Sequence, residues 1–225
     1  MSKFMAEAAL LFDLDGTMLM TDPIHMSVFA DLLAPRGLTV DEAFYMKHIH
    51  GRLNVDFFAE FLPDEPEPEG LSDLKEYEFR RRLPRPYPAM PGVMAVLETA
   101  HDHGWALGVV TNAMRENAEA MLAAIGARRY FDVVVSGEEC DQGKPHPAPY
   151  REALRLLNIP AHHAIAFEDS PAGVRSAAAA GIVTVGIRSS LDDGALRAAG
   201  ADMTIQDFTD PALGPILQRL TGVDA

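Results

Sequence analysis

The amino-acid sequence predicts an α/β fold, with a doubly wound, Rossmann-like parallel sheet as its core and an inserted α-helical cap domain. Short apolar runs recur along the chain and each ends abruptly in polar residues, which is typical of buried parallel strands. Segments with helical spacing separate these runs, and such alternation favours a doubly wound sheet. One interval breaks the alternation and shows helical spacing alone. We therefore expect a core domain of residues 1–20 and 88–225 and a cap domain of residues 21–87.

The first predicted strand is Ala8–Phe12, an apolar run that stops at the polar segment from Asp13 to Thr17. Later runs of the same form are Trp105–Val110, Phe131–Val135, Ala164–Phe167 and Ile182–Ile187. Ligands of such sheets lie outside the carboxyl ends of the strands. The polar residues that end these runs are therefore expected to be neighbours in space.

Helices are predicted between the strands, where apolar residues follow helical spacing. Their expected ranges are Gly92–His103, Arg115–Ile125, Ala148–Leu157 and Pro171–Ala180. The last begins with two strong signals, Ser170 as N-cap and Pro171 at the first helical position.

The predicted cap is rich in helix formers and has Leu, Phe and Met at three- and four-residue spacings from Thr21 to Leu83. The returning segment, Leu83–Gly92, contains four prolines and cannot be helical. Such a stiff linker suits a connection between a mobile insert and its base.

Composition excludes several classes of partner. Asp and Glu outnumber Lys and Arg by 33 to 19, so the net charge of −14 opposes binding to nucleic acid or anionic lipid. No apolar stretch is long enough for a membrane span, and we see no targeting segment. The single cysteine, Cys140, excludes an intramolecular disulfide and fits a reducing compartment. We therefore expect a cytoplasmic monomer without nucleic-acid or membrane partners.

Two pairs of acidic residues end predicted strands. Asp13 and Asp15 lie two apart, and Gly16 permits a tight turn after them. Covalent phosphoryl transfer needs a carboxylate nucleophile and a second carboxyl group that protonates the leaving oxygen, and this pair can supply both. Glu168 and Asp169 converge on the same sheet edge. Four acidic groups in one small site require a metal ion, and oxygen ligands alone favour Mg²⁺.

Thr111 and Asn112 end another strand, and Lys144 lies in a loop bounded by proline. A hydroxyl, backbone N–H groups and a lysine charge all suit phosphate oxygens. Taken alone, each signal has an ordinary explanation, because such residues are common in turns, in helix caps and on solvated surfaces. Their occurrence together at the predicted edge of one sheet is what points to phosphoryl transfer.

These motifs, Asp-x-Asp-Gly-Thr, a strand-ending Thr, Gly-Lys-Pro and Glu-Asp-Ser, occur in one order along the chain. In this the sequence resembles the haloacid dehalogenase superfamily, in its branch of capped phosphatases and beta-phosphoglucomutase-like enzymes, over essentially its whole length. The resemblance implies that Asp13 is the nucleophile, Asp15 the general acid and base, and Thr111 and Lys144 the phosphate stabilisers. It also implies that Mg²⁺ is held by Asp13, the backbone carbonyl of Asp15, and Asp169, with Glu168 alongside. Dehalogenases lack the second carboxylate, so the aspartate at position 15 disfavours dehalogenation.

The sequence departs from the family pattern in places, within the predicted cap and just before it. Met20 replaces an acidic residue. His25 keeps the position of a histidine that assists the active site in mutase-like members, although helix packing or solvent exposure explains it equally well. Gly51 and Arg52 lie in a segment that resembles a substrate-specificity loop. Arg52 follows Gly51 directly, whereas in beta-phosphoglucomutase the arginine comes three positions after the glycine, which weakens the mutase interpretation.

The sequence therefore predicts a Mg²⁺-dependent phosphatase that hydrolyses a small phosphomonoester, a sugar phosphate or related metabolite, through an aspartyl-phosphate on Asp13. The expected substrate contacts are His25, Gly51, Arg52, Thr111, Asn112 and Lys144. A beta-phosphoglucomutase-like enzyme is the alternative, and a non-catalytic module that binds a phosphometabolite is a third interpretation. The histidine pairs lack the spacing of a zinc site, and Cys140 has no visible base partner.

Overall fold

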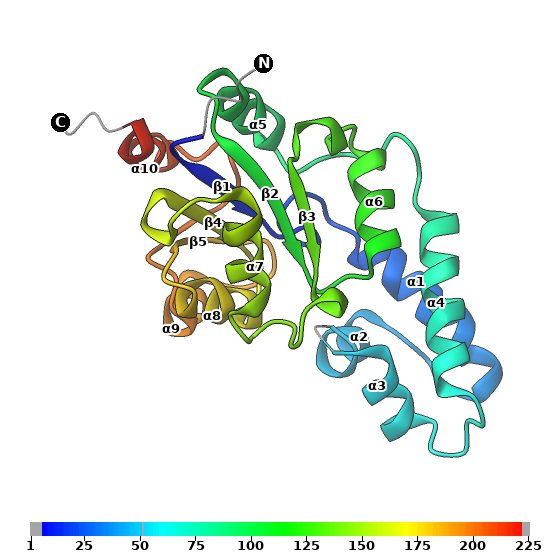
Figure 1. Cartoon of the computed structure of the whole chain (residues 1–225). Coiled ribbons are helices and arrows are strands. Elements are labelled where there is room, and N and C mark those ends of the chain that lie inside the picture. The colour runs from blue at the N-terminus through cyan, green and yellow to red at the C-terminus, as the bar shows by residue number, and fades with distance from the viewer. Residues whose placement is uncertain (1–5, 51, 222–225) are drawn as a thin grey trace. The chain divides into compact units, whose positions relative to one another are not determined.

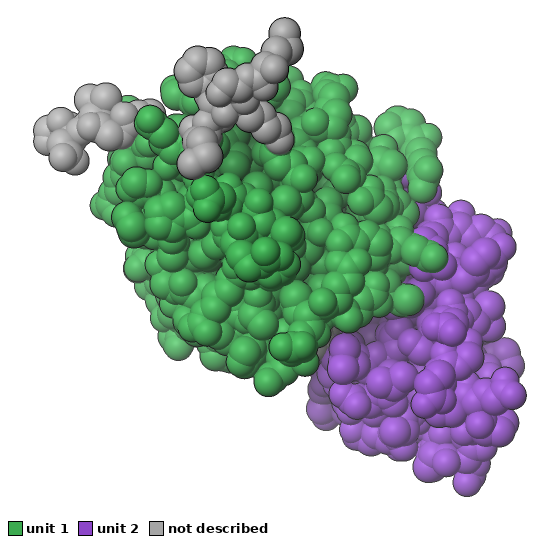
Figure 2. Space-filling model, viewed as in Figure 1, with its two compact units in different colours: residues 1–20, 85–225 green, residues 21–84 purple. Residues whose placement is uncertain are grey.

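The structure is a computed structural model that describes residues 6–50 and 52–221. The chain divides into two compact units (Figure 2). Unit 1 comprises Met1–Met20 and Arg85–Ala225, and unit 2 comprises Thr21–Pro84. Among the described residues, no helix combines the length and the apolar character needed to cross a membrane.

Unit 1 contains a parallel sheet that has six strands within the described residues, in the order β3-β2-β1-β4-β5-β6 (Figure 1). The first strand in the chain, β1, is therefore central, with β2 and β4 as its neighbours. This confirms the predicted α/β class. The strands are β1 (Ala9–Phe12), β2 (Ala106–Thr111), β3 (Val133–Ser136), β4 (Ala164–Glu168), β5 (Val183–Ile187) and β6 (Met203–Ile205).

Helices surround this sheet. The helix α7 contacts β2 and β3, while α8 contacts β4 and β5, and the two helices also contact each other. The helices of unit 1 are α5 (Val93–Asp102), α6 (Arg115–Ala124), α7 (Ala148–Leu157), α8 (Pro171–Ala179), α9 (Asp193–Ala199) and α10 (Leu213–Gln218). Short 3₁₀ turns in this unit are Arg128–Tyr130, Gly137–Glu139, Ala161–His163 and Arg219–Thr221.

The central strand is buried on both faces, which explains its continuous apolar run. All four residues of β1 are fully buried. Leu11 belongs to the apolar cluster that includes Tyr150 of α7. Phe12 is the next residue and therefore faces the opposite side. There its ring stacks on Phe167 at 4.9 Å between centroids and lies 5.9 Å from the ring of Phe208.

The predicted elements of unit 1 agree with the structure to within two residues at each end, and α7 has the predicted bounds. Ser170 is the N-cap of α8, where its hydroxyl accepts a hydrogen bond from the N–H of Gly173 at 3.0 Å. The sequence did not predict β6, α9 or α10. Each is short, with three to seven residues, so periodicity had too few positions to be recognised.

Unit 2 contains four helices in its described residues and no strand there. Its core is aromatic, with Phe29 edge-on to Phe57 at 5.5 Å and Phe58 fully buried beside them. The helices are α1 (Asp22–Leu33), α2 (Glu42–His48), α3 (Asn54–Phe61) and α4 (Pro68–Arg82), and a 3₁₀ turn covers Ala34–Arg36.

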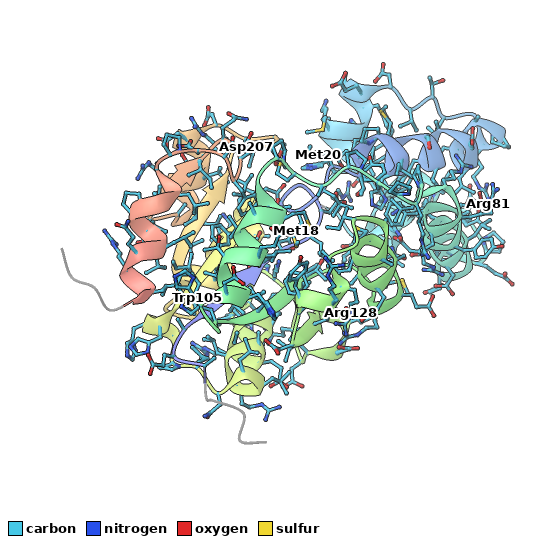
Figure 3. The ribbon with its side chains drawn as sticks, turned by 90° about the horizontal axis from the view of Figure 1, so that it is seen from above. Met18, Met20, Arg81, Trp105, Arg128 and Asp207 are labelled. Atoms are coloured by element: carbon cyan, nitrogen blue, oxygen red, sulfur yellow. The ribbon has the colours of Figure 1, made fainter. Side chains whose placement is uncertain are left out.

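The two segments of unit 1 that lead to and from unit 2 are bonded to each other. The backbone N–H of Met90 donates to the carbonyl of Met18 at 2.7 Å. The hydroxyl of Tyr87 donates to the carbonyl of Met20 at 2.6 Å. Figure 3 labels Met18 and Met20, which follow β1 in the chain and precede Thr21, the first residue of unit 2. The outgoing and returning segments are therefore fixed to the same part of unit 1.

Candidate active site

The polar residues that end the strands lie together at the carboxyl edge of the sheet, as predicted from their positions. Asp13 directly follows β1, and its N–H extends the pairing with β4 by donating to the Phe167 carbonyl at 3.0 Å. Glu168 is the last residue of β4 and Asp169 follows it. The loop after β3 supplies Lys144. All four side chains are buried, which removes them from the screening of bulk water.

Lys144 connects two of the acidic residues. Its Nζ donates to Asp13 Oδ1 at 2.6 Å, to Glu168 Oε1 at 2.5 Å and to the carbonyl of Val110 at 2.7 Å. The three donors of the ammonium group are thus all used. Burial lowers the pKa of Lys144, but the charges of Asp13 and Glu168 outweigh burial and leave this pKa raised. Lys144 therefore stays charged.

The loop that carries Lys144 is held by the side chain of Asn112. The amide Nδ2 of Asn112 donates to the carbonyl of Lys144 at 3.1 Å, and its Oδ1 accepts from the N–H of Lys144 at 2.9 Å. A Cβ at Gly137 or Gly143 would lie 2.5 Å or 2.9 Å from this Oδ1, so both glycines make room for the amide. The Asn112 side chain, predicted to contact substrate, is thus engaged with the lysine loop.

Glu168 is completely buried, and its two oxygens have different surroundings. Oε1 accepts from Lys144 and also from the hydroxyl of Tyr150, at 2.7 Å. Oε2 has no hydrogen-bond partner among residues 6–50 and 52–221. Burial, followed by the negative charge of Glu168, raises the pKa of Tyr150 well above its ordinary value, so its hydroxyl is a donor at neutral pH.

Asp169 is held by hydroxyl groups and lies against a glycine. Thr17 Oγ1 donates to Oδ1 at 3.4 Å, and Ser189 Oγ donates to Oδ2 at 3.3 Å. Gly16 has a φ of +76°, and a Cβ there would lie 2.0 Å from Asp169 Oδ2. Glycine is therefore required at position 16 both by the turn and by the neighbouring carboxylate.

The site carries more negative charge than Lys144 can balance. The pKa of Asp13 rises to about 7, and burial is the main cause. The positive charge of Lys144 lowers this pKa, while the negative charge of Glu168 raises it. Burial, with the charges of Asp13 and Glu168, raises the pKa of Asp169 well above its ordinary value. Such a cluster favours a further cation.

The donor set fits a metal ion. One carboxylate oxygen from each of Asp13, Glu168 and Asp169 lies within 4.8 Å of the others. These are hard oxygen donors, and the unpartnered Oε2 of Glu168 adds an acceptor that the described protein atoms leave unsatisfied. The three carboxylates can therefore hold a metal ion.

Asp15 and Thr111 complete the predicted set in unit 1. Asp15 is partly exposed, pairs with Leu19 through an isolated β-bridge, and contributes to the raised pKa of Asp13. Thr111 ends β2 and is buried, and its hydroxyl accepts from the N–H of Ala113 at 3.1 Å.

The predicted cap residues belong to unit 2. His25 stacks on Phe79 with ring centroids 4.0 Å apart, and its Nδ1 accepts from Lys75 Nζ at 2.8 Å. Arg52 donates to Glu60 Oε2 at 2.9 Å and, at 3.3 Å, to the carbonyls of His48 and Asp56. Both side chains thus have partners within unit 2. Gly51 lies outside the described residues.

Four further residues, to which the sequence assigned no role, contact the acidic cluster: Thr17, Tyr150, Gly173 and Ser189. A signal existed for Ser189, which follows β5 as the predicted residues follow their strands. Tyr150 lies within a predicted helix, where a buried tyrosine gives no sign of what its hydroxyl bonds.

Comparison with known proteins gives consistent matches. A family model described as haloacid dehalogenase-like hydrolase matches residues 10–187. The chain is 32% identical to validoxylamine A 7'-phosphate phosphatase of Streptomyces hygroscopicus subsp. limoneus, over 91% of this chain and 97% of that protein. It is 29% identical to a phosphorylated carbohydrates phosphatase of Thermotoga maritima, over 86% and 91%. The crystal structure of CbbY from Rhodobacter sphaeroides in complex with phosphate matches with a TM-score of 0.78 and 29% identity, over 90% of this chain and 95% of that one.

Proposed function

Because the chain belongs to the haloacid dehalogenase-like hydrolases, we propose that it is a Mg²⁺-dependent phosphatase of small phosphomonoesters, with sugar phosphates or related metabolites as substrates. The observation that carries this proposal is the buried cluster of Asp13, Lys144, Glu168 and Asp169 at the carboxyl ends of the strands. The names of two relatives support the substrate class. One is a phosphorylated carbohydrates phosphatase, and the other is a phosphatase of validoxylamine A 7'-phosphate.

In the proposed first step, a carboxylate oxygen of Asp13 attacks phosphorus and the bond from phosphorus to the ester oxygen breaks. Asp15 gives its proton to the departing oxygen, which leaves as an alcohol. A nucleophilic carboxylate must be ionised, and the contact of Lys144 with Asp13 Oδ1 favours the ionised form.

In the second step, a water molecule gives a proton to Asp15 and attacks the phosphorus of the aspartyl-phosphate. The bond between phosphorus and Asp13 breaks, so inorganic phosphate leaves and Asp13 is regenerated. Thr111 and Lys144 would bind phosphate oxygens. Asp13, Glu168 and Asp169, with the backbone carbonyl of Asp15, would hold Mg²⁺, which supplies positive charge against the repulsion between carboxylate and phosphate.

The proposal is tested by measuring phosphate release from hexose phosphates, nucleotides and p-nitrophenyl phosphate, with Mg²⁺ and with excess chelator. We expect release that requires Mg²⁺ and is fastest with sugar phosphates. If no compound releases phosphate but β-glucose 1-phosphate is isomerised, the protein is a mutase instead. Absence of both reactions, together with binding of phosphorylated compounds, would indicate the non-catalytic interpretation.

A further inference from the structure

Tyr150 contacts one carboxylate of the acidic cluster, Glu168, and also the lysine that bonds this carboxylate, Lys144. It lies on α7, is completely buried, and donates its hydroxyl proton to Glu168 Oε1 at 2.7 Å. Its ring also faces Lys144, whose Nζ lies 5.4 Å from the ring centroid. Tyr150 thus binds Glu168 through its hydroxyl and Lys144 through its ring.

The Glu168 carboxylate is held from three sides. Tyr150 and Lys144 both donate to Oε1. On another side lies Gly173 in the first turn of α8, where a Cβ would be 1.9 Å from Oε2. Oε2 receives no hydrogen bond from the described residues. The two hydrogen bonds to Oε1 and the backbone of α8 at Gly173 therefore keep Oε2 in place.

The hydroxyl of Tyr150 and the ammonium group of Lys144 both bond Glu168. Lys144 donates to Asp13 as well as to Glu168, so one ammonium group bonds both carboxylates. A buried carboxylate that loses a donor pays the desolvation penalty of that oxygen unless another donor compensates. Without the Tyr150 hydroxyl, Oε1 of Glu168 would keep only the hydrogen bond from Lys144 among those that the described residues make.

We propose that Tyr150 is a positioning residue, whose hydroxyl fixes the Glu168 carboxylate so that Asp13, Glu168 and Asp169 keep the spacing that a single metal ion requires. It acts through Glu168 and does not touch the substrate. This inference rests on the proposed function, because it assigns the cluster to metal binding. Residues that orient metal ligands typically change metal affinity by about 10–100-fold when they are removed.

The test is Tyr150→Phe, which keeps the ring and its packing and removes only the hydroxyl. We expect Mg²⁺ affinity, measured directly by isothermal titration calorimetry, to fall by about 10–100-fold. The Mg²⁺ concentration for half-maximal phosphate release should rise by the same factor, which a simple loss of folded protein would not produce.

Tyr45→Phe is the matched control. Tyr45 is also buried and donates to a carboxylate oxygen, Asp22 Oδ1, at the same distance of 2.7 Å. Asp22 is not among the carboxylates of the cluster. This variant should therefore bind Mg²⁺ as the unmodified protein does.

A double variant separates positioning from general stability. In a Glu168→Gln background, Tyr150→Phe should cause no further loss of Mg²⁺ affinity, because its effect passes through residue 168. If Tyr150→Phe alone does not fold by circular dichroism, the double variant should fold, and a double variant that also fails would overturn the proposal.

Two results separate the failure of this inference from the failure of the proposed function. If the unmodified protein binds Mg²⁺ and releases phosphate, but Tyr150→Phe binds Mg²⁺ within twofold of it, the positioning role is wrong and the function stands. If the unmodified protein neither binds Mg²⁺ nor releases phosphate, both proposals are wrong.

Discussion

At Gly173, contact with a neighbouring side chain outweighs the low helix propensity of glycine. Replacing glycine by alanine within a helix normally stabilises it by about 1 kcal/mol. At Gly173 a Cβ would overlap the carboxylate of Glu168. We therefore expect Gly173→Ala to destabilise the protein by about 1–3 kcal/mol, as overpacking does, and to lower phosphatase activity. Urea unfolding and phosphate release would measure both effects.

Gly70→Ala is the control for this prediction. Gly70 is the third residue of α4 and Gly173 is the third residue of α8, and each of these helices begins with a proline. Its Cβ would meet nothing closer than Glu67 at 3.6 Å. Gly70→Ala should be neutral or stabilising, and equal destabilisation by both substitutions would refute the assigned role of Gly173.

Asp13→Asn tests the nucleophile. The amide keeps the size of the side chain but cannot form the aspartyl-phosphate, so we expect phosphate release to fall on the order of 10⁴-fold or more. Asp102→Asn, at the exposed end of α5, should leave the rate unchanged. A variant of Asp13 that retains full activity would exclude the covalent mechanism.

At the scale of residues, the sequence indicated the candidate catalytic and metal-binding side chains but not the residues that hold them in place. Asp13, Lys144, Glu168 and Asp169 could be grouped because each lies at the carboxyl end of a strand or in the loop after one, and parallel strands bring their carboxyl ends together. The contacts of Tyr150 and Gly173 with Glu168 depend on how α7 and α8 pack, which residue spacing does not encode. The roles assigned to His25 and Arg52 in substrate binding stay predictions.

At the scale of elements, helices α1, α3 and α4 share a buried polar network in unit 2. Lys75 and Asn54 both donate to Glu76 Oε1, at 2.9 Å and 2.6 Å, and Lys75 also donates to His25. Burial raises the pKa of Glu76, but the charge and hydrogen bond of Lys75 outweigh burial, so this pKa lies below its ordinary value of 4.5. The ionised form of Glu76 therefore stabilises the fold.

This lowered pKa predicts a pH dependence. The stabilisation by Glu76 is fully present above its unfolded-state pKa and is lost as pH falls through the lower folded-state pKa. Glu76→Gln should thus destabilise the protein by about 1–3 kcal/mol at pH 7 and by much less under more acidic conditions. Urea unfolding followed by circular dichroism would measure the difference. Glu152→Gln, in an i,i+3 pair with Arg155 on α7, should have a smaller effect, and the prediction fails if the Glu76→Gln effect is independent of pH.

The strands were predictable because β1 is buried on both faces and therefore has a continuous apolar sequence. The edge strand β6 has two half-buried residues out of three and lacks this signature. The chain's division after Met20 and before Arg85 lies close to the expected boundaries, while movement of unit 2 as a cap stays a prediction.

At the scale of the whole molecule, the proposed binding of Mg²⁺ at the acidic cluster would raise stability. Buried like charges around a single lysine oppose folding when no metal is bound. At a Mg²⁺ concentration about 100 times the Kd, binding adds about 2.7 kcal/mol. In a chain of this size we expect the thermal midpoint to rise by roughly 5–10 °C.

Asp169→Asn should separate the charge repulsion in the metal-free protein from the stabilisation by bound Mg²⁺. It removes one of the crowded charges, so the metal-free protein should melt at a higher temperature than the unmodified protein. It also removes a proposed ligand, so the rise with Mg²⁺ should disappear. Differential scanning calorimetry with and without Mg²⁺ would measure both, and an unchanged rise in this variant would exclude Asp169 as a ligand.

The central place of β1 in the sheet has a consequence for synthesis on the ribosome. Among the strands, β1 emerges first, yet its partners β2 and β4 begin only at Ala106 and Ala164. At ordinary elongation rates β4 follows roughly 10–30 s later. Meanwhile unit 2 emerges completely and can fold before any partner of β1 exists. The apolar segment Ala9–Phe12 therefore has neither of its neighbouring strands to pair with until Ala106 and the residues after it have been made.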